Sequence, residues 1–163
     1  MTRIGLISDT HGLLRPQAKA FLRDCDRIVH GGDIGHAGIL EELGMLAPVT
    51  AVRGNNDAGA WADGLPDTAL LPVDKVLIHV LHDLSQLDID PAAAGVRVIV
   101  SGHSHKPRVD ERAGVLYVNP GSAGPRRFKL PVSIAELVID GGAVEARIVE
   151  LEVDALHNMR STG

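Results

Sequence analysis

The sequence predicts an α/β sandwich with mixed β-sheets. In the first 100 or so residues, strand-like apolar runs alternate with helix-like segments, as expected for parallel strands joined by crossovers. The last third instead shows two strand-like runs separated by Asp-Gly-Gly, which is typical of an antiparallel hairpin. Hydrophobic residues make up 45% of the 163 residues and aromatics only 2%, so the core must be aliphatic.

The first part of the chain predicts strands separated by helices. Pro16 falls in the first turn of the first predicted helix, where its missing N–H costs little. In chain order, the expected elements are a strand at 4–7, a helix at 13–24, a strand at 27–30, a helix at 38–46 and a strand at 49–53.

The middle of the chain predicts further strands and one short helix. We expect strands at 68–73, 75–81, 96–100 and 115–118. The unbroken apolar run at 96–100 is typical of a strand covered on both faces. Residues 90–95 suit a short helix, with Asp90 as the N-cap and Pro91 at the first helical position.

The C-terminal third predicts a hairpin of strands at 132–139 and 143–153. The apolar phase of the second strand slips by one residue after Ile148, which predicts a β-bulge or a strand end there. Residues from about 156 onwards have no packing pattern and are expected to fray. Nothing resembles an interdomain linker, so we interpret residues 1–163 as a single domain.

Composition narrows the classes of function. Sixteen Lys and Arg against 21 Asp and Glu give a net charge of −5, which argues against a broad nucleic-acid or membrane-binding surface. Cys25 is the single cysteine, so no internal disulfide can form. No apolar run approaches the roughly 20 residues of a membrane span, and the N-terminus lacks a signal-peptide pattern. We therefore expect a soluble, cytoplasmic protein.

Five apolar strands are each followed by residues that can bind metal. Because ligand sites in open α/β sheets lie beyond the carboxyl ends of the strands, these residues can converge. Imidazole nitrogens and oxygens without a thiolate suit Mn²⁺, Fe, Zn²⁺, Co²⁺ or Ni²⁺. The residues are Asp9 and His11, then Asp33, then Asn55 to Asp57, then His82 and Asp83, and last His103 and His105.

Each of these motifs also has an ordinary structural interpretation. A lone Gly-Asp or Gly-Asn usually marks a turn, and a lone histidine often packs in a core. The recurrence at five strand ends favours a metal centre. For the middle histidine we prefer His82, because it follows the predicted strand, whereas His79 lies inside it and is expected to pack.

The order D-x-H, G-D, G-N-x-D, H and G-H-x-H resembles the calcineurin-like metallophosphoesterases over essentially the whole chain. Asn-Pro-Gly-Ser at 119–122 is similar to the small single-domain phosphodiesterase branch of that family. The resemblance implies a four-layer α-β-β-α sandwich of two mixed sheets flanked by helices. It also implies two divalent ions, with Mn²⁺ as first choice. By position, one ion would be bound by Asp9, His11, Asp33 and His105, and the other by Asp33, Asn55, His82 and His103.

The resemblance further implies that the protein hydrolyses a small phosphodiester by attack of a hydroxide that bridges the two ions, with Asp33 as the bridging carboxylate. Two ions and two aspartates would give the site a charge of about +2, which attracts phosphate. Many relatives have histidine where this chain has Asn56, and an amide cannot deliver a proton to a leaving group. His36 is the nearest alternative acid in the sequence, and Asp57 is expected to steady the loop.

Some interpretations stay open. A phosphomonoesterase or nucleotide hydrolase of the same superfamily, or a non-catalytic interaction module of this fold, would share most of these motifs. Arg126 and Arg127 would either meet substrate phosphate or simply be exposed. The sequence does not decide whether the protein forms a homo-oligomer.

Overall fold

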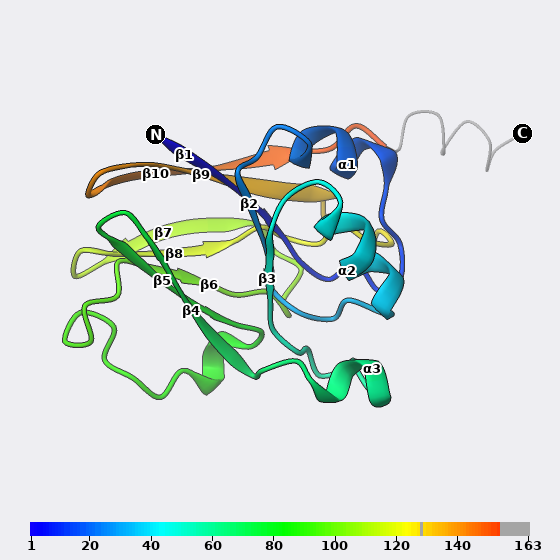
Figure 1. Ribbon diagram of the computed structural model, residues 1–163, viewed down its shortest axis with the longest axis horizontal. Helices are drawn as coiled ribbons and strands as arrows, with labels where there is room; N and C mark the ends of the chain where they lie inside the picture. Colours follow the sequence, from blue (N-terminus) through cyan, green and yellow to red (C-terminus); the bar gives the residue numbers. More distant parts are fainter. Residues whose placement is uncertain (128, 154–163) are drawn as a thin grey trace, which may run out of the picture.

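Two five-stranded mixed sheets lie face to face in the computed structural model, which describes residues 1–127 and 129–153 (Figure 1). The predicted frayed tail, 156–163, and His157 within it lie outside the described residues. Within those residues, no helix is both long and apolar enough to cross a membrane.

The first sheet combines parallel strands from the start of the chain with the C-terminal hairpin. Its order is β10-β9-β1-β2-β3. Strands β1, β2 and β3 are parallel to one another, and β9 is antiparallel to both of its neighbours, β1 and β10. The strands are β1 (Thr2–Ile7), β2 (Arg27–His30), β3 (Val49–Ala51), β9 (Ser133–Asp140) and β10 (Ala143–Glu150). The crossovers contain α1 (Pro16–Leu22) and α2 (Ala37–Gly44).

The second sheet has a parallel centre and antiparallel edges. Its order is β4-β5-β6-β8-β7, in which β5, β6 and β8 are parallel. The strands are β4 (Thr68–Val73), β5 (Val76–Leu81), β6 (Val98–Val100), β7 (Arg108–Arg112) and β8 (Val115–Asn119). A short helix, α3 (Ala60–Asp63), precedes this sheet, and a 3₁₀ turn, η1 (Leu84–Gln86), follows β5.

Three aliphatic clusters hold the layers together. Residues such as Leu6 and Ile78 fill the space between the sheets, and Leu22 and Leu43 of α1 and α2 pack on the outer face of the first sheet. The outer face of the second sheet, around Ile99, is covered by residues from the segment 84–96. The predicted sandwich is confirmed, and its fourth layer is a single 3₁₀ turn with irregular chain.

One local prediction was wrong, and another was confirmed only in its second alternative. Residues 90–95 form a turn that ends at Gly95 in a left-handed conformation (φ 77°), although the Asp90 side chain does accept a hydrogen bond from the Ala93 N–H. Of the two alternatives near Ile148, the bulge does not occur, because β10 pairs with β9 in one continuous register, and the strand ends close by at Glu150. Ile148 packs between the sheets and Val149 packs on the helix side, so the phase slip reflects a strand covered on both faces.

Candidate metal centre

The carboxyl ends of the parallel strands of both sheets meet at one edge of the sandwich. The loops that follow β1 and β2 bring Asp9, His11 and Asp33 to this edge from the first sheet. The loops after β5 and β6 bring His82 and His105 from the second sheet. Residues separated by almost a hundred positions in the chain therefore lie side by side, as the strand-end pattern predicts.

Two overlapping groups of ligand atoms form the centre. Each group holds three side chains whose ligand atoms lie within 4.8 Å of one another, and Asp9 belongs to both. Oδ2 of Asp33 lies 3.2 Å from Nε2 of His82 and 3.8 Å from Nε2 of His11. Oδ1 of Asp9 lies 3.4 Å from Nε2 of His105. Both carboxylates thus lie between histidine nitrogens.

Asn55 and His103 lie at the open side of this cluster. Oδ1 of Asn55 is 3.2 Å from Nδ1 of His103, and the His103 ring meets the His82 ring edge-on at a centroid distance of 5.2 Å. The structure places His82, not His79, in the cluster. His79 is buried in β5 on the same face as Leu77 and Leu81, toward the outer layer of the second sheet.

Five of the candidate ligands have a left-handed backbone. They are Asp9 (φ 55°), His11 (46°), Asp33 (55°), His103 (70°) and His105 (64°). In the described residues the other non-glycine cases are Asp74 and Ala113, in the turns between β4 and β5 and between β7 and β8. Such a conformation costs about 1–2 kcal/mol for a residue with a Cβ. The chain thus turns sharply at the strand ends and directs these side chains to one point.

The buried polar atoms of the cluster fit a cation. Asp9 is fully buried, and its Oδ1 makes no hydrogen bond, although an unpaired buried carboxylate is costly. Its Oδ2 is held by the Ser8 hydroxyl at 2.7 Å and the His103 N–H at 3.2 Å. Nδ1 of His82 donates to the Gly31 carbonyl at 2.7 Å, so Nε2 carries the lone pair, and that atom makes no hydrogen bond of good geometry. Oxygen and imidazole donors of this kind suit divalent transition metals.

The pKa values of the cluster reflect burial and close charges. Burial raises the pKa of Asp9. Burial also acts to raise the pKa of Asp33, but His82 and the Asn56 N–H outweigh it and lower that pKa to about 2. Burial acts to lower the pKa of His82, but Asp33 and the Gly31 carbonyl outweigh it and raise that pKa. Because a metal binds the neutral imidazole, the raised pKa of His82 means that protonation competes with metal binding at this residue.

The three residues named as catalytic candidates have different positions. Asn56 donates to Asp33 twice, from its N–H at 2.8 Å and from Nδ2 at 3.2 Å. Asp57 accepts hydrogen bonds from three backbone N–H groups, those of Ile34 and Gly35 through Oδ1 and that of Gly54 through Oδ2, and so ties the loop after β2 to the loop after β3. His36 is the exposed N-cap residue of α2, with its ring beside Gly12. Neither ligand group of the described residues includes His36, so an acid role for His36 is still a hypothesis.

The Asn-Pro-Gly-Ser segment braces the same loops. Nδ2 of Asn119 donates to the Gly102 carbonyl at 2.9 Å, and the Ser122 hydroxyl donates to the Asp9 carbonyl at 2.9 Å. Arg127 lies on the His105 side, where its guanidinium adds to the effect of burial in lowering the pKa of that histidine. Arg126 donates to the Leu130 carbonyl at 3.2 Å.

His30 is a fully buried histidine that connects two of the loops around the centre. Its Nδ1 accepts from the Gly32 N–H at 3.0 Å, so Nε2 must carry the proton that bonds Oγ1 of Thr10 at 3.0 Å. The Thr10 hydroxyl donates in turn to the Ile34 carbonyl at 2.7 Å. This chain links the loops after β1 and β2. Burial lowers the pKa of His30 to about 3.

We expect His30 to make the free energy of unfolding fall as the pH drops below about 6.5. In that range His30 binds a proton in the unfolded chain but stays neutral in the native protein. Between about pH 7 and about pH 5 this contribution amounts to about 2 kcal/mol of unfolding free energy. Urea unfolding of the native protein and His30→Gln, both with a chelator, measures it. The variant should be less stable near neutral pH but should lose less stability on acidification. Parallel pH profiles for the two proteins would contradict the prediction.

The sequence comparisons agree with the geometry. The model of the calcineurin-like phosphoesterase superfamily domain matches residues 2–142. The chain belongs to this superfamily. A probable metallophosphoesterase of Methanothermobacter thermautotrophicus is 36% identical over 159 residues, which cover 90% of this chain and 91% of the relative.

Solved structures show the same fold. One, described as a novel archaeal phosphodiesterase, has a TM-score of 0.74 and 23% identity and covers 90% of this chain and 99% of its own. Vps29 of Chaetomium thermophilum has a TM-score of 0.76 and 18% identity and covers 93% and 100%. Members of the calcineurin-like superfamily are hydrolases that use divalent metals, and the cluster of aspartates and histidines offers the ligands that such ions need.

Proposed function

We propose that the protein hydrolyses a small phosphodiester at a centre of two divalent ions. The observation that carries the proposal is the pair of overlapping ligand groups, Asp9 with His11 and His105, and Asp9 with Asp33 and His82. In this proposal Asp33 contacts both ions, which its Oδ2 supports by lying between His82 and His11.

The remaining ligands divide between the two ions by position. His11, His105 and Asp9 would hold the first ion, and His82, Asn55 and His103 would hold the second. Mn²⁺ remains our first choice, with Fe, Zn²⁺, Co²⁺ and Ni²⁺ compatible with the same donors. Bound ions would supply Lewis acidity toward the phosphoryl group and activate water for attack.

The residues themselves orient the centre. Ser8 and the His103 N–H fix one oxygen of Asp9 so that the other faces the cluster. The Gly31 carbonyl fixes the His82 ring, and Asp57 holds the loop that carries Asn55 and Asn56. Asn56 can donate hydrogen bonds to a phosphate but cannot protonate a departing oxygen. This combination suits diesters that have good leaving groups.

The relatives support this choice and also define its rivals. One structural neighbour is a phosphodiesterase, whereas Vps29 shares the fold and keeps the interaction-module hypothesis open. Here every ligand position expected from the family motif holds a residue that can bind metal, which favours the enzyme. A phosphomonoesterase would use the same centre.

Metal analysis and a two-substrate assay test the proposal. Purified protein loaded in turn with each of the candidate metals is expected to bind two ions per chain and to hydrolyse bis(4-nitrophenyl) phosphate faster than 4-nitrophenyl phosphate. A faster reaction with the monoester would favour the phosphomonoesterase. Absence of both bound metal and hydrolysis would favour the interaction module.

Asn56→His is expected to change which leaving groups the enzyme tolerates. A histidine with a pKa near 6.5 can protonate a poor leaving group, and general acid catalysis is typically worth about 10²–10⁴-fold. The value of kcat/KM should therefore rise mainly for alkyl phosphodiesters and little for aryl ones, whose oxide departs unprotonated. Asn56→Gln, which keeps the amide, is the matched control and should show no such gain. An equal effect of Asn56→His on both ester types would contradict the prediction.

A further inference from the structure

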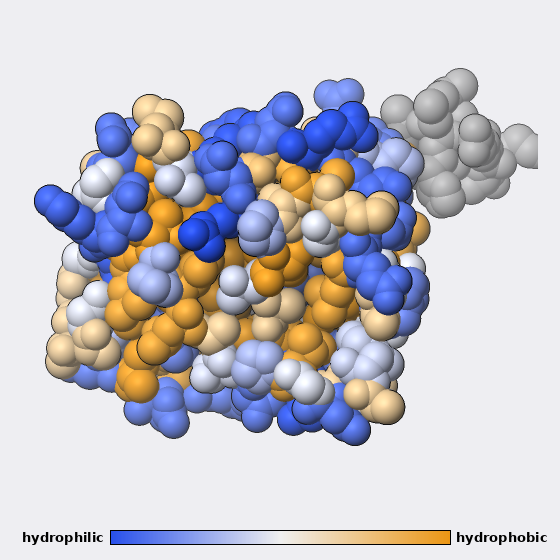
Figure 2. All heavy atoms as spheres, in the orientation of Figure 1, coloured by the Kyte–Doolittle hydropathy of each residue, from blue (hydrophilic) through white to orange (hydrophobic). Residues whose placement is uncertain are grey.

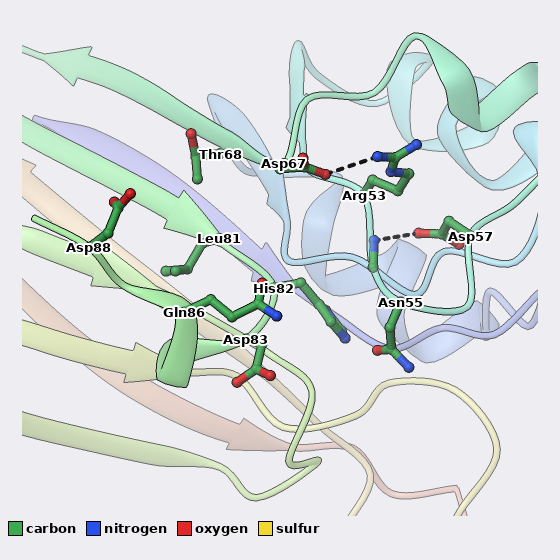
Figure 3. A pocket seen from close by; sticks show the side chains of 11 residues that line it. Arg53, Asn55, Asp57, Asp67, Thr68, Leu81, His82, Asp83, Gln86 and Asp88 are labelled. Atoms are coloured by element: carbon green, nitrogen blue, oxygen red, sulfur yellow. Dashed lines mark hydrogen bonds and ion pairs between the residues drawn. The ribbon is translucent and has the colours of Figure 1, made fainter.

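A cavity of about 510 Å³ opens beside the metal centre, on the side of His82 and Asn55 (Figure 3). Its walls come from the loop after β3 and from the segment that follows β5. Its volume is in the range of small-molecule sites. His82 is only 6% exposed, and it both lines this cavity and belongs to the ligand group with Asp9 and Asp33. The cavity and the metal centre thus form one continuous site.

Acidic side chains dominate the charge of this cavity. Arg53 is the one Lys or Arg that lines it within the described chain, and its guanidinium pairs with Asp67 at 3.2 Å. On the opposite side, Asp83 and Asp88 project from the segment after β5 (Figure 3). Asp88 makes no hydrogen bond or ion pair within residues 1–127 and 129–153, and the one titratable group it acts on there is the buried His79, whose pKa it acts to raise. Oδ2 of Asp83 lies 3.9 Å from Nε2 of His103, and His103 and His82 both act to lower the pKa of Asp83. Two carboxylates therefore stay without a full cationic partner.

Apart from His82 and from Asp57, whose carboxylate accepts hydrogen bonds from three backbone N–H groups, the rest of the lining is neutral. Ser85 donates two hydrogen bonds to Oδ1 of Asp83, from its N–H at 3.0 Å and from its hydroxyl at 2.8 Å. These bonds lower the pKa of Asp83, so the Asp83 carboxylate is ionised near neutral pH. Thr68 and Gln86 add a hydroxyl and an amide, and Leu81 adds an apolar surface. The cavity thus suits a ligand with a positive charge and a short carbon skeleton.

A second cavity, of about 450 Å³, has the opposite charge and shares one wall, Asp83. Lys106, Arg108 and Arg112 line it, together with Tyr117, whose ring has the Arg112 guanidinium 4.8 Å from its centre. An anionic or aromatic group therefore has a better site here than in the acidic cavity. The two ester groups of a phosphodiester would therefore lie in cavities of opposite charge.

We propose that the acidic cavity binds one ester group of the substrate and selects a cationic alcohol, an amino alcohol of the ethanolamine or choline kind. This inference rests on the proposed phosphodiesterase activity. With the phosphate at the metal centre, the ammonium group would lie near Asp83 and Asp88, while an anionic group would be repelled.

Three 4-nitrophenyl phosphodiesters with the same leaving group test this selection. Their second alcohols are choline, its uncharged isostere 3,3-dimethylbutanol, and an anionic hydroxy acid of similar length. Two partly exposed ion pairs together correspond to about a tenfold preference, so kcat/KM should be about tenfold higher for the choline ester than for the neutral one and lowest for the anionic one. Added salt should reduce the preference. Equal rates for all three esters would overturn the inference and leave the phosphodiesterase proposal standing.

A pair of charge-matched variants tests whether the preference for a cationic alcohol arises in the acidic cavity. Asp88→Asn should lower the ratio of kcat/KM for the choline and neutral esters about threefold, because one of the two carboxylate charges is lost. Asp90→Asn removes the same charge from the same segment but from a residue outside the cavity lining, so it should leave the ratio unchanged. Equal ratios in the two variants would overturn the assignment to this cavity.

Binding without turnover separates this inference from the proposed function. Calorimetric titration of the Mn²⁺-loaded protein with phosphocholine and with 3,3-dimethylbutyl phosphate should show tighter binding of phosphocholine by a similar factor. If no diester is hydrolysed with any metal, the proposed function fails, and this comparison still decides what the cavity prefers. Equal affinities would overturn the inference.

Discussion

An Asp33→Asn variant is expected to lose at least one metal ion and almost all hydrolysis. Oδ2 of Asp33 lies 3.2 Å from Nε2 of His82 and 3.8 Å from Nε2 of His11, closer than Oδ1 of Asp9 does at 4.0 and 3.9 Å, so the proposed bridge depends on the negative charge of Asp33. Loss of a residue that only supports a metal ligand typically costs about 10–100-fold in affinity or activity, so loss of the bridging ligand should lower kcat/KM by more than about 100-fold. Metal analysis of the purified variant and assay on bis(4-nitrophenyl) phosphate measure both effects.

Asp74→Asn is the matched control for this prediction. Asp74 also has a left-handed backbone, with φ 50° against 55° for Asp33, but it lies in the turn between β4 and β5, away from the ligand groups. It should keep both ions and full activity. Full metal content together with retained turnover in Asp33→Asn would refute the bridging role.

The sequence predicted most of the strands because their apolar patterns are local. It missed β7, whose residues Arg108 to Arg112 are mostly charged and largely exposed. Such an edge strand is held by backbone pairing with β8 and leaves no hydrophobic pattern to detect. The misread phase slip at Ile148 has a similar cause, since periodicity cannot show that a second layer covers the other face of a strand.

The candidate ligands could be predicted because their residue types recur at strand ends. The left-handed conformations that aim them leave little trace in the sequence beyond the tolerance of Asp and His for that region. The sequence could not show which groups Asp57 binds, because its hydrogen-bond donors Ile34 and Gly35 lie more than 20 residues away in the chain. Likewise, the opposed charges of the two cavities depend on loops that only the fold brings together. Figure 2 shows hydrophobic residues across the middle of one face of the molecule, with hydrophilic residues mostly around its margin.

The close packing of the loops after β2 and β3 yields the second large expected effect, that of Gly54→Ala. A Cβ on Gly54 would overlap the backbone N and Oδ1 of Asp33 and lie 2.8 Å from its Cα. The φ of Gly54 is outside the left-handed region, so alanine would be strained by contact alone and not by its backbone preference. Overpacking of this kind costs about 1–3 kcal/mol of stability, and a shift of about 1 Å in a catalytic group can cost about 10²-fold in rate.

We therefore expect Gly54→Ala to fold with a lowered Tm, to bind metal weakly and to lose about 10²-fold in kcat/KM. Gly64→Ala is the control, because its Cβ would meet nothing within 4 Å and its φ of −83° is ordinary for alanine. Thermal unfolding, metal content and kcat/KM measured on both variants separate a general loss of stability from displacement of Asp33. Unchanged metal content and turnover in Gly54→Ala would mean that the contact with this loop does not position Asp33. A loss of activity that follows thermal unfolding and recovers on cooling would lead to the same conclusion. Loss of metal and activity at temperatures where the variant is folded would instead show that the positions of Gly54 and Asp33 are coupled, because no other atom of the variant differs from the native protein.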